Sequence, residues 1–135
     1  MQQKIDRSAI SPDESEKLKD ELADNLQVSD GILEIRQILR HKKRFLDLLL
    51  LADEQESMIN LYLERGEMFA LYDQNILRTI CVVTNEGNKT VELKNIATDP
   101  QYQKLGYGKK LIKFISEHYA GKYDTLLVGT GESPL

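Results

Sequence analysis

Residues 90–131 constrain the fold of this chain more than any other segment. They begin with "TVELKNIAT" (90–98), a β-branched stretch with alternating polar residues, which is followed by an Asp-Pro pair that stops the strand. Two glycines then precede an apolar run at helical spacing, and the predicted helix extends from about residue 105 to 119, where Gly121 closes it. "DTLLVGTG" (124–131) is a further strand. A strand, a helix and a strand in this order predict a right-handed crossover between parallel neighbours.

The remaining segments predict a mixed α/β sheet that is mainly antiparallel, with flanking helices. Strands are expected at 32–39, 67–73 and 76–86, and "GNK" forms the turn into the strand at 90–98. Two helices lie between the first two strands, "KRFLDLLLLA" and a second helix that Asp53 caps. An N-terminal helix is expected at 11–27, with Ser11 as its cap. We therefore divide the chain into a helical extension over 1–30 and one domain over 31–135.

The two glycines, Gly106 and Gly108, stand at the start of the helix expected after the Asp-Pro turn. A helix N-terminus presents unpaired amides and a partial positive charge, and glycine lets a bulky anion approach them. The segment therefore indicates a phosphate-binding loop. A Walker A loop requires glycine at position 103, which is Gln103, and a dinucleotide fingerprint requires glycine at position 111, which is Leu111. Both of these nucleotide-binding motifs are excluded.

The pattern that does fit is Q-x-x-G-x-G, written here as "QKLGYG" (103–108). With the strand before it and the helix and strand after it, this segment resembles the acetyl-coenzyme A signature of the GNAT superfamily of N-acetyltransferases. "FLDLLLLADEQESMINLYLERGEMFALYD" is similar to the corresponding part of small bacterial members. The resemblance covers residues 32–135 and is strongest over 90–131. It implies the acyl-CoA N-acyltransferase fold and acetyl-CoA as co-substrate.

The resemblance also implies which residues bind the coenzyme. The loop amides hold its diphosphate, and free amides of the preceding strand pair with its pantetheine arm and face the thioester, while the strand at 124–131 forms the other side of the wedge. Carried onto this sequence, the binding residues are Ile96, Ala97, Thr98, Gln103, Lys104, Leu105, Gly106, Tyr107, Gly108 and Lys109. The alternative is a helix start whose glycines serve only tight packing.

Glu92 is the candidate catalytic residue. An alkylamine has a pKa of about 10, so its attack on a thioester at neutral pH requires a base that removes a proton. Glu92 lies fourteen residues before Gly106, where several members of the superfamily place a catalytic glutamate. The alternative is that Glu92 lies on a solvated face or pairs with a neighbour such as Lys94. His118 and Cys81 are weaker candidates, expected at the surface and in the core.

Composition limits the partners, the cellular compartment and the metal content that we expect for this chain. The formal charge of −4 argues against nucleic acid as the main partner, and the longest apolar run, "FLDLLLLA", is too short to cross a membrane. A single cysteine precludes an intramolecular disulfide and suits the reducing cytoplasm. With two distant histidines and that one cysteine, the chain lacks the ligand clusters of a zinc site, so we expect no metal.

The sequence differs from the family pattern in one respect. Members of the superfamily usually continue past the last strand expected here with a further helix and strands. An open strand edge beside an uncovered apolar face favours association, so we expect a homodimer or exchange of elements between chains. The first functional hypothesis is an N-acetyltransferase that moves acetyl from acetyl-CoA to a primary amine by direct attack in a ternary complex. Its alternatives are a catalytically silent acyl-CoA-binding or regulatory module of the same fold and, less favoured, another phosphate-ligand binder. The acceptor amine is left open.

Overall fold

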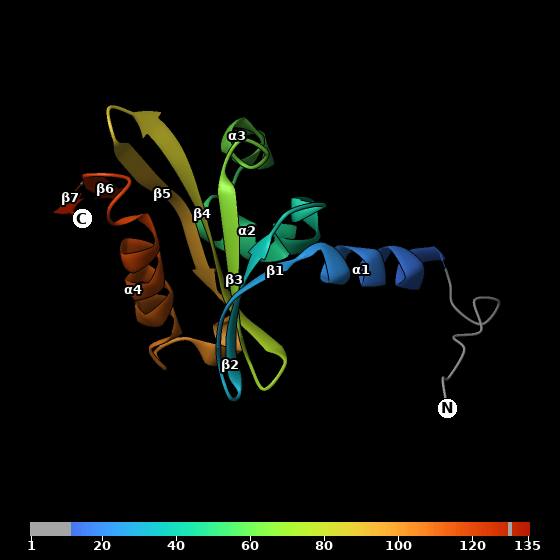
Figure 1. Cartoon of the computed structure of the whole chain (residues 1–135). Coiled ribbons are helices and arrows are strands. Elements are labelled where there is room, and N and C mark those ends of the chain that lie inside the picture. The colour runs from blue at the N-terminus through green and yellow to red at the C-terminus, as the bar shows by residue number, and fades with distance from the viewer. Residues whose placement is uncertain (1–11, 130) are drawn as a thin grey trace.

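The computed structural model describes residues 12–129 and 131–135, and its centre is a seven-stranded sheet whose strands follow the order of the chain (Figure 1). Neighbouring strands are antiparallel except β5 and β6, which are parallel. The strands are β1 (Asn25–Asp30), β2 (Leu33–Ile38), β3 (Glu67–Asp73), β4 (Ile76–Gly87), β5 (Thr90–Thr98), β6 (Thr125–Val128) and β7 (Gly131–Pro134).

Helices cover both faces of this sheet (Figure 1). On one face lie η2 (Lys42–Phe45), α2 (Leu46–Ala52) and α3 (Glu56–Tyr62), and on the other lies α4 (Tyr107–Tyr119), which follows the short η3 (Pro100–Tyr102). Helix α1 (Pro12–Ala23) extends outward from the start of β1. Ion pairs join this helix and Asp24, which follows it, to residues 40–44; they include His41–Asp20 at 2.8 Å and Arg44–Asp24 at 2.8 Å.

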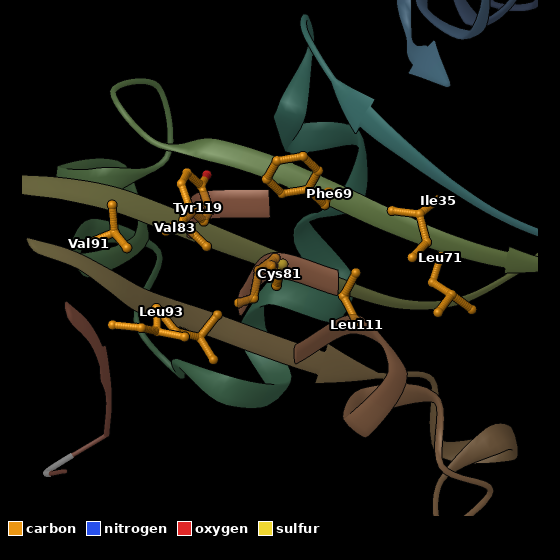
Figure 2. Packing of buried hydrophobic residues seen from close by; sticks show 11 residues of the cluster. Ile35, Phe69, Leu71, Cys81, Val83, Val91, Leu93, Leu111 and Tyr119 are labelled. Atoms are coloured by element: carbon orange, nitrogen blue, oxygen red, sulfur yellow. The ribbon is translucent and has the colours of Figure 1, made fainter. Parts of the chain in front are cut away.

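Each face of the sheet has its own apolar core. Under α4, Phe69, Cys81 and Val83 of the central strands pack against Leu111 and Tyr119 of the helix (Figure 2). On the opposite face, residues of β3 and β4 pack against α2 and α3; the buried members of this second core include Leu49, Ile59, Leu63, Met68, Ile80 and Val82. Alternate residues of β4 therefore enter opposite cores, as expected for a central strand.

The mixed α/β prediction and its parallel crossover are confirmed. Strands β3 and β5 have the predicted bounds, and α4 connects β5 to a parallel β6. Two-residue turns with positive φ close the hairpins, at Gln74–Asn75 and at Asn88–Lys89, which suits the right-handed twist of the strands. Within the described residues, no helix has the length and apolar character needed to cross a membrane.

The predicted N-terminal helix is wrong in its last turn. Helix α1 ends at Ala23, and Asn25–Asp30 form β1, which pairs with β2. The spacing of Leu18, Leu22 and Leu26 does suit a helix, but pairing with β2 outweighs that local preference. The predicted cap Ser11 lies outside the described residues.

Two further details differ from the predictions. The expected strand at 124–131 is two antiparallel strands, because the chain reverses at Gly129, which has a φ of 60°, and β7 pairs back onto β6. Asp53 is not the cap of α3, whose N-cap is Gln55 without a side-chain bond. Asp53 instead accepts a hydrogen bond from Tyr62 near the end of that helix, at 3.3 Å.

Candidate functional site

A wedge opens between β5 and β6, the two parallel strands. Their pairing covers four residues and ends at Leu93 and Val128, whereas the pairing of β5 with β4 continues to Thr98. A β-bulge marks the point of divergence: Asn95 pairs with Val82 and Leu93 with Val83, so Lys94 is the additional residue on β5. Bulges bend the strand that carries them, so this bulge directs the end of β5 away from β6.

The free edge of β5 presents the backbone of two of the three strand residues predicted to bind the coenzyme. Asp99 donates its amide to the carbonyl of Arg78 on β4 at 2.9 Å. Because the direction of backbone groups alternates along a strand, Ala97 also faces β4, while Ile96 and Thr98 face the wedge. The Gln103 side-chain amide donates to the carbonyl of Thr98 at 3.2 Å. The amides of Ile96 and Thr98 are therefore the groups that the wedge offers to a ligand.

The predicted loop connects this free edge to α4. Gly106 is the N-cap of the helix at a φ of 90°, and the first helical hydrogen bond runs from the Lys110 amide to the Gly106 carbonyl at 3.1 Å. No described residue accepts a hydrogen bond from the amides of residues 105–109. A Cβ at Gly106 would meet no atom within 4 Å, and one at Gly108 would meet only Thr98 Oγ1, at 3.8 Å. Open amides at a helix N-terminus form a site for an anion.

The side chains of the loop point in different directions. Lys104 and Lys109 are exposed, and so is Leu105, whose accessible fraction is 61%. The hydroxyl of Tyr107 turns toward the end of β3, where it donates to Asp73 Oδ2 at 2.6 Å, and this bond raises the pKa of Tyr107. The hydroxyl of Tyr107 is thus already engaged, and only its backbone amide is available to an anion.

Glu92 lies on the face of the sheet that α2 and α3 cover, since Val91 and Leu93 point into the core under α4. Its carboxylate contacts the ammonium of Lys94, which also pairs with Glu86 at 3.1 Å. The bond to Glu92, followed by the bond to Glu86, raises the pKa of Lys94. The bond to Lys94 in turn lowers the pKa of Glu86. The structure therefore places Glu92 in the ion pair that was the alternative to a catalytic role, at the narrow end of the wedge.

Asn95, which the sequence reasoning missed, ties the wedge strand to the helices. The bulge at Lys94 turns its side chain into the core under α2 and α3, where it is buried. Its Nδ2 donates to the carbonyl of Leu49 and to the hydroxyl of Tyr62, both at 3.0 Å, and burial raises the pKa of Tyr62. A polar residue at a buried strand position is the one sequence signal that could have indicated this tie.

The weaker candidates play structural roles. Cys81 is fully buried, which raises the pKa of its thiol to about 12, so it is protonated and inert at neutral pH. His118 is exposed on α4, and its ring packs against Phe69 and Phe114 at centroid distances of 5.2 and 5.3 Å. Cys81 lies on β4 as the cross-strand partner of Ile96, with its side chain in the core under α4.

Two hollows lie on the α2 side of the sheet. The larger, of about 660 Å³, separates α1 from Phe45, Tyr72 and Leu77. The smaller, of about 370 Å³, shares Phe45 and Leu77 with it and reaches Asp99 and Pro100, where the loop begins. Asp20 of α1, which lines the larger hollow, pairs there with His41 at 2.8 Å and with Arg44 at 3.9 Å.

Comparison with known proteins agrees with this geometry. Residues 32–131 match a family model described as the acetyltransferase (GNAT) family. Over 91 residues the chain is 40% identical to YvbK of Bacillus subtilis strain 168, an uncharacterized N-acetyltransferase; the match covers 66% of this chain and 58% of that relative. The chain thus spans less than two-thirds of that relative's length.

Solved structures show the same architecture. A GNAT family acetyltransferase from Elizabethkingia anophelis with acetyl-CoA bound has a TM-score of 0.68 and 31% identity, over 76% of this chain and 67% of the other. A Bacillus subtilis acetyltransferase in complex with CoA has a TM-score of 0.63 and 30% identity, over 80% of this chain and 66% of the other.

Proposed function

This chain belongs to the acetyltransferase (GNAT) family, and on that premise we propose that it transfers the acetyl group of acetyl-CoA to a primary amine by direct attack in a ternary complex. The observation that carries the proposal is the row of unpaired amides that runs from the free edge of β5 into the first turn of α4. The structural relatives with acetyl-CoA or CoA bound support the same ligand.

The described residues fit this ligand in three respects. The amides of residues 105–109 have no protein acceptor, so a diphosphate gains hydrogen bonds there without displacing any. Gly106 and Gly108 leave the approach open. The edge of β5 at Ile96 and Thr98 can pair with an extended amide-bearing arm in the manner of an added strand.

Each group then has a defined task in the reaction. Acetyl-CoA supplies the acetyl group as a thioester. The amine nitrogen attacks its carbonyl carbon, so that a C–N bond forms and the C–S bond breaks, and coenzyme A leaves as its thiolate with the electron pair of the C–S bond. The wedge amides of Ile96 and Thr98 donate to the oxygen that gains negative charge. We assign Glu92 as the base that accepts the amine proton, directly or through water, which requires its carboxylate to exchange the contact with Lys94 for the amine.

Calorimetric titration with acetyl-CoA tests ligand binding, and absence of heat at millimolar ligand would remove the proposal. Release of free thiol with a panel of primary amines tests transfer. Glu92→Gln should lower kcat at pH 7 by about 10²-fold or more while coenzyme affinity stays within twofold. The matched control is Glu86→Gln, because Glu86 pairs with the same Lys94 and should leave kcat within a few-fold. Equal losses in both variants would assign the effect to the ion network.

The ion pair of Glu92 with Lys94 favours one second candidate, a catalytically silent acyl-CoA-binding or regulatory module. A silent module binds acetyl-CoA in the titration but releases no thiol with any amine in the panel. The two assays together therefore distinguish the enzyme from the module, and a protein that fails both is neither.

We further propose a bacterial, cytoplasmic protein, without nucleic acid, membrane or metal partners, whose copies associate through a sheet edge. We retain the division into an extension over 1–30 and an acetyltransferase domain over 31–135. Light scattering at micromolar concentration tests association, since a stable monomer would exclude it. Deletion of residues 1–30 tests the division, because a domain that begins at residue 31 should still bind acetyl-CoA.

A further inference from the structure

We infer that Arg78 of β4 is a positioning residue for the coenzyme loop, and that its buried charge increases the affinity for the anionic ligand. The inference rests on the proposed function, because it concerns how the same loop is held. The motif does not include Arg78, which lies 25 residues before Gln103 on another strand.

A second bulge directs this side chain toward the loop. Leu71 of β3 pairs with Thr79 of β4, and the next residue, Tyr72, pairs with Leu77, so Arg78 is the additional residue. Leu77 and Ile80 consequently enter the same core although they are three residues apart, which a regular strand does not allow. Because the bulge interrupts the regular alternation of side chains along β4, Arg78 extends to the side of the sheet where η3 and α4 begin.

The guanidinium of Arg78 contacts residues at both ends of the loop. It lies over the ring of Tyr102, directly before Gln103, at 3.9 Å from the centroid, and 5.5 Å from the ring of Tyr107, in the loop. Its NH2 group donates to the carbonyl of Asp73 at 3.1 Å, while the carboxylate of Asp73 accepts the hydroxyl of Tyr107. These contacts with the β3–β4 hairpin, together with the bond of Gln103 to Thr98, hold the loop in place.

The charge of Arg78 is buried without an anionic partner. The residue is only 8% exposed, its Nε has no hydrogen-bond acceptor, and no carboxylate of the described residues forms an ion pair with it. Burial of an uncompensated charge is costly, and an anion bound nearby offsets that cost. Arg78 lies 5.5 Å from the ring centroid of Tyr107, the first residue of α4, whose amide is one of those that receive the diphosphate in the proposed function. The loop is thus held in shape and given a positive potential by one side chain.

Arg78→Met tests this inference, because methionine keeps the length of the side chain and removes its charge and planar group. We expect the Kd for CoA and the KM for acetyl-CoA to rise about 10-fold, within the range of a buried cation–π contact, with kcat at saturating acetyl-CoA within twofold. Arg78→Lys keeps the charge and should recover part of the affinity. The affinity of Arg78→Met should also fall less steeply with salt than that of the parent protein.

The matched control is Arg36→Met. Arg36 also lies over a tyrosine, with its guanidinium 4.2 Å from the ring centroid of Tyr72, but on β2, away from the loop. It should leave Kd and KM within twofold. If Arg78→Met does not fold, Tyr102→Leu removes the main stacking partner and should raise Kd in the same direction.

The possible outcomes distinguish failure of the proposed function from failure of the role assigned to Arg78. Parent protein that does not bind CoA removes the proposed function. Parent protein that binds CoA, together with Arg78→Met or Tyr102→Leu of unchanged affinity, overturns the role of Arg78 alone. An equal rise of Kd in Arg36→Met, or a fall in kcat as large as the loss of affinity, would also overturn it, because either points to general destabilisation.

Discussion

Replacement of Gly108 by alanine should raise stability and weaken coenzyme binding at the same time. Gly108 occupies the first turn of α4 with helical backbone, and the added Cβ meets only Thr98 Oγ1, at the ordinary contact distance of 3.8 Å. Alanine is favoured over glycine in a helix by about 0.5–1 kcal/mol, which corresponds to a rise in Tm of about 2–4 °C in a chain of this size. The protein itself therefore has no need of glycine here.

A bound diphosphate does need glycine at this position in the proposed site. The Cβ occupies the approach to the unpaired amides, and one lost hydrogen bond to a charged group costs about 1.5–3 kcal/mol, or about 10- to 150-fold in Kd. Thermal unfolding and calorimetric titration with CoA measure the two effects on one sample. A stabilised variant that binds CoA with parent affinity would refute the placement of the diphosphate.

Gly106→Ala supplies the comparison. At a φ of 90°, alanine is strained by about 1–3 kcal/mol, so this variant should lose both stability and affinity. At Gly108 we expect stability to rise while affinity falls, and at Gly106 we expect both to fall. This difference distinguishes an effect on ligand access from an effect on backbone conformation. A lower Tm for Gly108→Ala would contradict a helical, uncrowded backbone at this position.

Three other features are open to measurement. Asn95→Ala should lower the free energy of unfolding in urea by about 1–3 kcal/mol, since it removes two buried hydrogen bonds; a change below about 0.5 kcal/mol would contradict the tie to α2 and α3. Cys81, with a thiol pKa of about 12, should not react with a thiol reagent at pH 8 in the native state and should react fully in denaturant, so rapid native labelling would contradict its burial. Burial alone raises the pKa of Asp20, but its bond to His41 and the nearby Arg44 lower it below the ordinary 3.8; the stability that this carboxylate contributes is present above pH 3.8 and lost as the pH falls through the lowered value. Urea unfolding of Asp20→Asn between pH 2 and 6 should therefore show a weaker acid dependence than the parent, and identical slopes would exclude the contribution.

The sequence alone determined the unit from β5 to β6. Pro100, the two loop glycines and the apolar spacing of α4 act on the backbone within a few residues, so their consequences can be read without knowledge of the rest of the chain. The order of the central strands was predictable for the same reason, because turn residues and short apolar runs mark each of them. The location of the loop that we propose to bind the coenzyme was predicted from that local pattern together with the family resemblance.

The tertiary structure decided everything that depends on a partner strand. Asn25–Asp30 is a strand because β2 offers an edge, and the last predicted strand is two because β7 pairs back onto β6. The bulges at Arg78 and Lys94 are mismatches of register between two chain segments, so neither segment alone contains them. One additional residue in a strand reverses the face that every following side chain occupies, and it bends the strand. The bulge at Arg78 therefore directs that side chain toward the loop. The bulge at Lys94 places Asn95 against the helices α2 and α3 and separates the end of β5 from β6.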